Sequence, residues 1–263
     1  MKLQEISANG MAICYIEISE NFLLSVSYWD SFLTVFRIES DGRLTQTHCY
    51  EEFAMKTELL PENHHDELRQ NEPHFHCIVK NNQRNDIFYV ADLGSNSIRI
   101  FKLSEFGTIK QVKEIVHPVR MTGPRFLRCK EGKIYVANEL NSTLSVFDVT
   151  ENGENLKLVS DKELFPGLEV GSTFAANIEI IGNKIYISNR GDNTISVFDQ
   201  LTEKYLQKIP TLGKIPRSFA INANFLLIAN EATDSIVSFK KTGDDYEFVD
   251  KINLPGPNFI CFQ

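Results

Sequence analysis

An all-β fold is predicted by three features of the chain. Short runs rich in Val, Ile, Phe and Tyr are separated by turns of Gly, Asn and Asp. No stretch keeps the period of a helix. A unit of four such runs recurs at roughly 40- to 50-residue intervals, which is the size of a four-stranded propeller blade. Together these features favour a β-propeller over its rival, a β-sandwich.

The repeat is clearest from Gly123 to Phe147, where a turn, an inner strand, an Asn-Glu pair and an alternating strand follow one another. The other copies, the first of them the weakest, span residues 9–36, 72–101, 171–198 and 213–239. The sequence therefore predicts five recognisable blades in a single domain, 1–263.

Within this repeat the first blade is expected to hold four strands, with a hairpin signal at Asp41-Gly42. Residues 51–73 break the rhythm, since they are charged and contain two prolines, and they predict a long loop insertion. Each later unit ends in a more polar run, as an outer edge strand should. Residues 255–263 resemble the start of another inner strand and are expected to be a terminal closing strand.

Composition excludes several classes of function. A net charge of −8 and a pI near 5.3 argue against nucleic-acid binding. The chain has no long apolar run and no apolar leader, so neither a membrane span nor a secretory signal is expected. The five cysteines lack CxxC spacing and indicate reduced thiols in a cytoplasmic protein. No metal motif or Gly-rich phosphate loop is present, so neither a metal nor a cofactor is expected.

Polar side chains recur where an inner strand begins and where its neighbour ends. Antiparallel neighbours place both positions at one rim, so these groups are expected around one mouth of the channel. The residues are His74, His76, Arg125, Asn177, Arg217, Asp92, Asn138-Glu139, Asn189-Arg190 and Asn230-Glu231. Capping of turns is the preferred role for Asn138, Asn189 and Asn230, and it is one of two roles open to Asp92, the other being ligand binding. An ion pair across blades is the alternative for Glu139 and Arg190.

Five motifs in this order resemble the bacterial-type lactonase propellers, which include the seven-bladed 6-phosphogluconolactonases and the fungal carboxymuconate cyclases. They are RQNEPHFH (69–76), YVADLG (89–94), GPRF (123–126), VANEL (136–140) and YISNRG (186–191). The resemblance implies catalytic roles for His74, Arg125, Glu139 and Arg190. It implies substrate binding by Arg69, Gln70, His76 and Asp92, to which Arg217 is added from its place in the repeat.

The implied function is hydrolysis of a sugar-acid lactone, in the first place 6-phosphogluconolactone to 6-phosphogluconate in the pentose phosphate pathway. The expected partner is a small anionic lactone, and the oligomeric state stays open. Arg125 and Arg190 would hold the carbonyl oxygen and the anionic group, with Glu139 or His74 as general base. A lactonising cyclase and a non-catalytic binding platform are the alternatives.

Two positions depart from the family pattern. Phe126 stands where the family usually has His after GPR, and Ser27-Tyr28 stands where an early blade usually has Asn-Tyr. About two N-terminal blades of the family also have no counterpart, so the sequence leaves open a smaller closed ring or an N-terminally truncated chain with an open edge.

Overall fold

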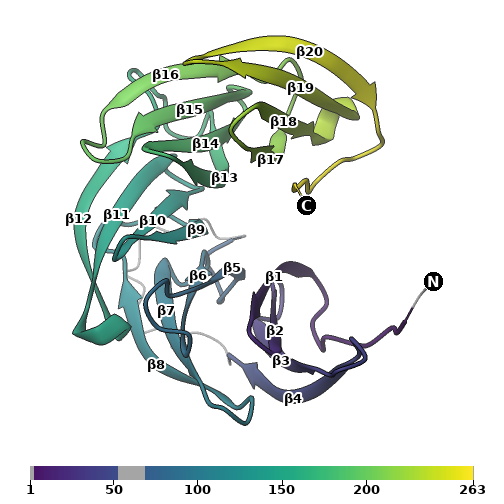
Figure 1. Cartoon of the computed structure of the whole chain (residues 1–263). Helices are drawn as coiled ribbons and strands as arrows, with labels where there is room; N and C mark the ends of the chain where they lie inside the picture. The colour runs from purple at the N-terminus through teal and green to yellow at the C-terminus, as the bar shows by residue number, and fades with distance from the viewer. Residues whose placement is uncertain (1–2, 53–68, 263) are drawn as a thin grey trace. The chain divides into compact units, whose positions relative to one another are not determined.

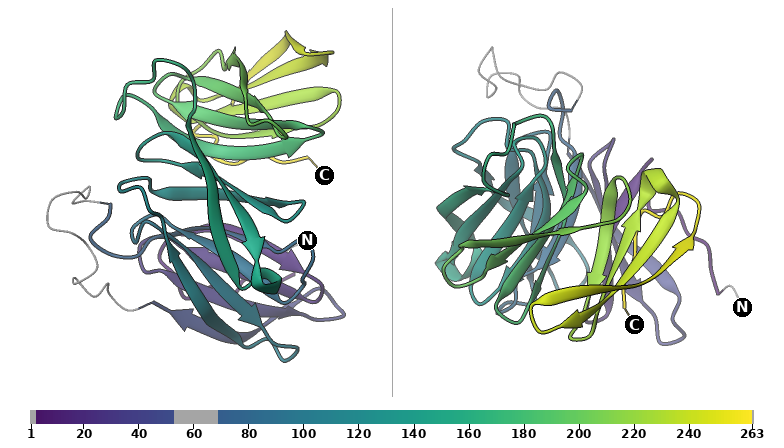
Figure 2. Two further views of the ribbon diagram at one scale, coloured as in Figure 1. Left: turned by 90° about the vertical axis from the view of Figure 1, so that its left-hand side faces the viewer. Right: turned by 90° about the horizontal axis from the view of Figure 1, so that it is seen from above.

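The computed structural model describes residues 3–52 and 69–262. Their regular structure is almost entirely β-strand, and the strands form five four-stranded sheets in which each strand pairs with its sequence neighbours (Figure 1). Each sheet twists, as sheets of L-residues do (Figure 2). The predicted all-β fold with repeated four-stranded blades is confirmed. Most of the predicted loop insertion, residues 53–68, lies outside the described residues.

The bounds of the strands follow the predicted repeat. The first sheet contains β1 (Ile13–Ser19), β2 (Phe22–Ser27), β3 (Phe32–Ile38) and β4 (Leu44–Glu51). The second contains β5 (Phe75–Lys80), β6 (Ile87–Asp92), β7 (Ser97–Leu103) and β8 (Ile109–Val116). The third contains β9 (Pro124–Lys130), β10 (Lys133–Asn138), β11 (Thr143–Thr150) and β12 (Asn155–Glu163). The fourth contains β13 (Phe174–Ile181), β14 (Lys184–Arg190), β15 (Thr194–Asp199) and β16 (Tyr205–Pro210). The fifth contains β17 (Pro216–Ile221), β18 (Phe225–Asn230), β19 (Ser235–Thr242) and β20 (Asp245–Asn253).

Turn chemistry explains where strands end. Gly42 has φ 82°, a conformation that suits glycine, and it closes the hairpin between β3 and β4 as the Asp41-Gly42 pair predicts. Two 3-10 helices, η2 (Glu151–Gly153) and η3 (Glu231–Thr233), connect strands of the third and fifth sheets. Residues 254–262 form no strand, in contrast to the predicted closing strand. These residues make single hydrogen bonds, such as that from the Ile260 N–H to Ser218 Oγ at 3.3 Å, and no strand ladder.

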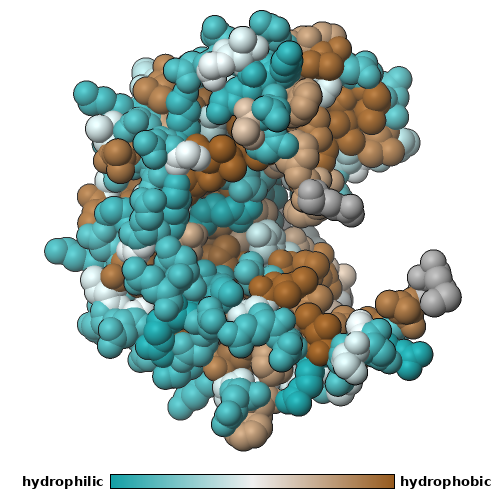
Figure 3. Space-filling view, viewed as in Figure 1, coloured by the Kyte–Doolittle hydropathy of each residue, from teal (hydrophilic) through white to brown (hydrophobic). Residues whose placement is uncertain are grey.

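Burial follows position within a sheet. Every residue of β6 is buried, because a central strand of a packed sheet is covered on both faces. The outermost strand β20 is exposed along almost its whole length. Apolar side chains at its surface include Phe248 and Ile252. Hydrophobic surface, coloured brown, gathers at the upper right of Figure 3. The predicted polar outer strands are therefore exposed, and the apolar runs are core.

The chain divides into two compact units. The first comprises Met1–Val136 and Ser145–Ser160, and the second comprises Ala137–Leu144 and Asp161–Gln263. The first unit has a core of aromatic and aliphatic side chains centred on Phe75, Phe88 and Phe101. The second has its own core, which includes Tyr186 and Phe219. The single propeller domain of the sequence analysis remains a prediction.

The first strands of four sheets carry an irregularity at the same place, one or two residues after their start. In β5, Phe75 pairs with Asp92 and Cys77 with Ala91, so His76 is the extra residue of a β-bulge. The same shift makes Cys14 the extra residue in β1 and Arg217 the extra residue in β17. In β13 it falls between Ala175 and Ile178. Bulges bend a strand and redirect a side chain. The side chains at these positions therefore point in other directions than they would in a regular strand.

Among the described residues, no helix is long and apolar enough to cross a membrane.

Candidate active site

His74 lies directly before β5 and is fully buried. Its Nδ1 is 2.9 Å from the carbonyl oxygen of Tyr28. A carbonyl oxygen only accepts, so this contact requires a proton on Nδ1, and the lone pair of the neutral ring is then on Nε2. Nε2 is buried and has no hydrogen-bond partner among the described residues. In its neutral form the ring therefore presents a lone pair at Nε2, as a general base requires.

Aromatic rings hold the imidazole of His74 in place. The ring of Tyr28 is stacked on it, with centroids 4.5 Å apart and planes 6° apart. The ring of Trp29 meets it edge-on at 5.5 Å and is 52% exposed. The turn that follows β2 therefore fixes the orientation of His74 and leaves the chain's single tryptophan open to solvent.

His76, Phe126 and Arg125 form the other part of this cluster. The His76 ring is 5.6 Å from Tyr28 and 6.1 Å from Phe126 between centroids. Arg125 is 2% exposed, and its guanidinium carbon is 5.5 Å from the centre of the Phe126 ring, which is cation–π geometry. Phe126, where the resembled family usually has His, thus packs between two predicted site residues.

Asp92 is fully buried, and protein groups surround its carboxylate. Oδ1 accepts hydrogen bonds from the backbone N–H of His74 at 2.8 Å and of Ser95 at 2.9 Å. Oδ2 accepts one from Nε of Arg99 at 2.8 Å. These contacts match the turn-capping alternative for an Asp at a strand end. Direct contact of Asp92 with a substrate stays a prediction.

The segment before His74 is pressed against the turn after β6. Gln70 is buried and donates from Nε2 to the carbonyl oxygen of Leu93 at 3.0 Å, while Arg69 is half-buried. A Cβ on Gly94 would lie 1.8 Å from the carbonyl oxygen of Glu72. Only glycine therefore permits this close approach, and the contact holds the RQNEPH segment in place.

Glu139 and Arg190 lie in the second unit and form an ion pair with 2.8 Å between Oε2 and Nη2. Their side chains are 6% and 16% exposed. Nη2 of Arg190 also donates to the carbonyl oxygen of Ala175 at 3.1 Å. Nε of Arg190 is buried and has no hydrogen-bond partner among the described residues. The ion-pair alternative is therefore realised, and one N–H of this guanidinium has no acceptor among the described residues.

Arg217, the bulge residue of β17, lies near Glu231, which begins η3. The two side chains are about one-third exposed, and the Nη1 and Oε2 atoms are 3.4 Å apart. This second Arg–Glu pair has a longer distance between its charged atoms and is more exposed to solvent than the first. It therefore contributes little to stability.

The repeated asparagines are structural. Asn138, Asn189 and Asn230 are fully buried. The side-chain amides of the first two donate to the hydroxyls of Thr143 and Thr194, at 2.9 and 3.0 Å. The Asn230 amide donates to the carbonyl oxygen of Thr211 at 3.1 Å. Their preferred role in holding turns agrees with these contacts, although two of the three bond hydroxyls where backbone was expected.

The predicted residues thus fall into two sets, one in each unit. The first unit holds Arg69, Gln70, His74, His76, Asp92 and Arg125, and the second holds Glu139, Arg190 and Arg217. Sequence reasoning missed Trp29 and Arg99. The sequence signal for Trp29 is its place beside Tyr28 at the position that departs from the family pattern.

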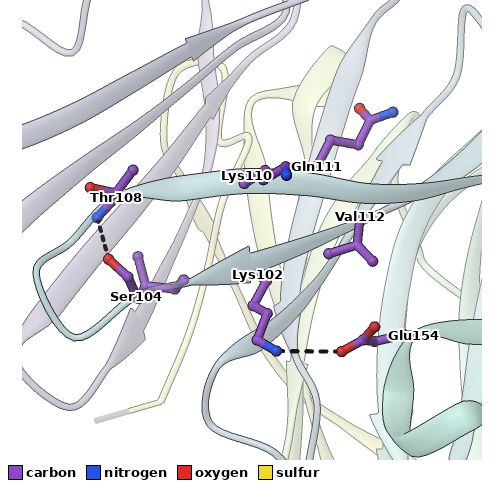
Figure 4. A pocket seen from close by; sticks show the side chains of 8 residues that line it. Lys102, Ser104, Thr108, Lys110, Gln111, Val112 and Glu154 are labelled. Atoms are coloured by element: carbon purple, nitrogen blue, oxygen red, sulfur yellow. Dashed lines mark hydrogen bonds and ion pairs between the residues drawn. The ribbon is translucent and has the colours of Figure 1, made fainter.

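A pocket of about 480 Å³ lies elsewhere, along β7 and β8 (Figure 4). Lys102, Lys110 and Glu154 are among its lining residues, and Lys102 Nζ is 3.5 Å from Glu154 Oε1. None of the predicted site residues lines it. Within the described residues, no group of three or more His, Cys, Asp or Glu side chains is arranged to hold a metal ion.

Comparison with known proteins assigns the family. The family described as "Lactonase, 7-bladed beta-propeller" matches residues 1–262. The 6-phosphogluconolactonase of Bacillus subtilis is 24% identical over 269 residues, covering 97% of this chain and 74% of its own. That of Yersinia pseudotuberculosis is 29% identical over 168 residues, covering 59% and 50%.

Solved structures show the same fold. A protein from Lactobacillus plantarum superposes with a TM-score of 0.82 at 22% identity, covering 94% of this chain and 73% of its own. The periplasmic gluconolactonase of Pseudomonas aeruginosa superposes with a TM-score of 0.78 at 20% identity, covering 93% and 71%. The family match over almost the whole sequence, together with the five four-stranded sheets, shows that this chain belongs to the lactonase family of seven-bladed β-propellers.

Proposed function

We propose that the chain hydrolyses the lactone of a sugar acid, with 6-phosphogluconolactone as its substrate. The carrying observation is the His74 imidazole, whose Nδ1 contacts the Tyr28 carbonyl oxygen and whose buried Nε2 has no hydrogen-bond partner among the described residues. Family membership and relatives named 6-phosphogluconolactonase support this substrate class.

In the proposed reaction His74 Nε2 takes a proton from water as the water oxygen attacks the lactone carbonyl carbon. The carbonyl oxygen gains negative charge, and the buried guanidinium of Arg125 is assigned to stabilise it. When the tetrahedral intermediate collapses, the bond from the carbonyl carbon to the ring oxygen breaks. The ring oxygen leaves with the proton held by His74, and the product is a hydroxy acid.

The family resemblance, and not a contact with the first unit, is the basis on which the arginines of the second unit are assigned to the anionic end of the substrate. Arg190 is held by Glu139 yet keeps its Nε–H available, and a guanidinium is the group of choice for phosphate oxygens. Glu139 orients Arg190 in this assignment, which leaves the role of base to His74. Arg217 is assigned to the same anionic group because its contact with Glu231 is loose.

The test is hydrolysis of 6-phosphogluconolactone by the purified chain, measured against the spontaneous rate. Arg190→Ala and His74→Gln are expected to lose at least about 100-fold in kcat/KM. Arg43→Ala removes an exposed guanidinium and is the matched control, with wild-type activity expected. Gluconolactone, which lacks the phosphate, distinguishes the role of His74 in the reaction from the role of Arg190 in phosphate binding. Arg190→Ala should lower the rate of gluconolactone hydrolysis far less than that of 6-phosphogluconolactone hydrolysis. No rate above background from a folded chain would reject the proposal in favour of the binding-platform alternative.

A further inference from the structure

Arg99 is a buried cation that has no direct role in the proposed reaction. It lies on β7, is 4% exposed, and its guanidinium meets three carboxylates. Nε contacts Asp92 at 2.8 Å, Nη1 contacts Glu52 at 3.0 Å, and Nη2 contacts Glu114 at 3.3 Å.

Neutral groups complete the shell around this guanidinium. Nη1 also donates to Gln111 Oε1 at 3.2 Å, and Nη2 donates to Ser95 Oγ at 3.0 Å. Burial lowers the pKa of Arg99, but the charges of Asp92, Glu114 and Glu52 raise it, and the net result is above the ordinary value. The group is therefore a permanent cation whose position is set from several sides.

The contacts continue from Arg99 to His74 through one carboxylate. Oδ2 of Asp92 accepts from Arg99, and Oδ1 accepts from the backbone N–H groups of His74 and Ser95. A carboxylate held at both oxygens cannot rotate without breaking a charge-assisted bond. The backbone at His74 is thereby fixed at the point where its ring reaches the Tyr28 carbonyl oxygen.

We infer that Arg99 is a positioning residue: it orients Asp92, which in turn fixes His74 as the base. This inference rests on the proposed function for the role of His74, but the placement of the ring can be tested without any substrate. A merely structural Arg99 would change stability and leave the hydrogen bonding of His74 as it is.

The first readout is the ¹⁵N NMR spectrum of the histidine rings of the whole chain, with His74→Gln used to assign the His74 signals. In the wild type we expect the Nδ1–H form. In Arg99→Met, where the Asp92 carboxylate loses its cation, we expect a mixture of ring tautomers. Arg99→Lys keeps the charge but not the fork of N–H donors, and a partial return to the Nδ1–H form is expected.

The second readout is steady-state hydrolysis of 6-phosphogluconolactone. Arg99→Met is expected to lower kcat by about 10- to 100-fold with a smaller change in KM, as loss of a supporting hydrogen bond does in other sites. Arg84→Met is the matched control. It removes a guanidinium that lies in the turn between β5 and β6 and pairs with Asp86 at 2.7 Å, not with Asp92. It should leave the His74 spectrum and kcat unchanged.

Two results would overturn the inference. One is an unchanged His74 tautomer in Arg99→Met, and the other is a kcat in that variant equal to that of Arg84→Met. If Arg99→Met does not fold, Asp92→Asn is the variant that tests the inference. The side-chain amide of asparagine has only one oxygen that can accept, so it cannot replace both contacts of the carboxylate, and the same loss of the Nδ1–H form of His74 is expected in Asp92→Asn. If the wild type is inactive but the tautomer responds to Arg99→Met, the proposed function fails while the positioning of His74 stands.

Discussion

The imidazole of His74 and the ring of Tyr28 are stacked 4.5 Å apart and nearly parallel, and the carbonyl oxygen of Tyr28 contacts the same imidazole at Nδ1. Tyr28 therefore contacts the proposed base twice, through its ring, which lies against the imidazole plane, and through its carbonyl oxygen, which accepts from Nδ1. The carbonyl contact belongs to the backbone and survives substitution, whereas the stacked ring does not.

Tyr28→Leu is expected to lower kcat by about tenfold, because the imidazole loses the ring that fixes its plane, a contact that contributes about 0.5–1.5 kcal/mol. Tyr28→Phe keeps the ring and should retain activity within about twofold. Steady-state kinetics of both variants check this. Equal losses in the two would show that the hydroxyl is what matters and not the stacking.

The Glu139–Arg190 pair is expected to behave as a buried pair. Glu139→Gln and Arg190→Met should each lower the free energy of unfolding by about 3 kcal/mol, since each leaves one charge buried without its partner. The double variant should lose clearly less than the sum of the two. Urea unfolding of the four proteins gives the coupling energy.

The matched comparison for this cycle is Arg84–Asp86, a 2.7 Å pair whose side chains are about one-third exposed. Its coupling energy is expected to be no more than about 1 kcal/mol. If the two cycles gave the same coupling energy, burial would not be the cause of the Glu139–Arg190 coupling.

Gly94→Ala is expected to push the segment before His74 away from its turn, because the new Cβ would meet the carbonyl oxygen of Glu72. We expect a loss of about 1–3 kcal/mol in stability together with a loss of activity. Gly243→Ala is the control, since nothing lies within 4 Å of its Cβ and only its positive φ adds strain. Thermal unfolding and activity assays separate the two, and full activity in Gly94→Ala would contradict the proposed packing.

The thiols should differ sharply in reactivity. Burial raises the pKa of Cys77 to about 12, so only about one thiol in 10⁴ is ionised at pH 8. Cys261 is exposed and should react first with a thiol reagent in the folded protein. Cys261→Ser should remove that fast phase, and all five cysteines should react in urea. Rapid labelling of Cys77 in the native state would show that the core of the first unit opens.

Glu17 predicts a pH dependence of stability. Burial raises the pKa of its carboxyl above the ordinary 4.5, against the opposing charges of Arg128 and Lys80. The folded state then holds this proton more tightly than the unfolded state does. Its stabilising contribution is therefore complete below pH 4.5 and is lost as pH rises through the higher folded value.

Glu17→Gln is thus expected to be more stable than the wild type at pH 7 and to have no such advantage at pH 4. Urea unfolding at both pH values checks this, with exposed Glu105→Gln as the control. A variant less stable than the wild type at pH 7 would mean that the attraction of Arg128 and Lys80 outweighs burial.

Much of the fold could be predicted because its signals are local. Alternating apolar runs and the Asp41-Gly42 turn depend on residues next to each other, and they mark four strands per sheet correctly. The terminal strand was predicted from the same kind of run at residues 255–263, but a strand also needs a partner with matching register, which no local pattern supplies.

Less of the candidate site could be predicted from the sequence, because its contacts join residues that are far apart in the chain. The role of Asp92 depends on Arg99, a residue of the next strand, so the motif alone left turn-capping and substrate binding equally open. Phe126 departs from the family pattern in the sequence, but its packing against His76 joins it to another strand. Opposite charges at equivalent positions of the repeat make an ion pair between Glu139 and Arg190 one alternative, and the 2.8 Å contact confirms that alternative.

The β-bulges in the first strands of four sheets set one side chain apart from the ladder of paired residues. An extra residue such as His76 or Arg217 stands outside the pairing on either side of it, so its replacement leaves the neighbouring core residues in register. Each sheet can then exchange its functional side chain independently of the others. A scaffold repeated in this way can acquire new substrates one position at a time, without rebuilding the hydrophobic interior that holds it together.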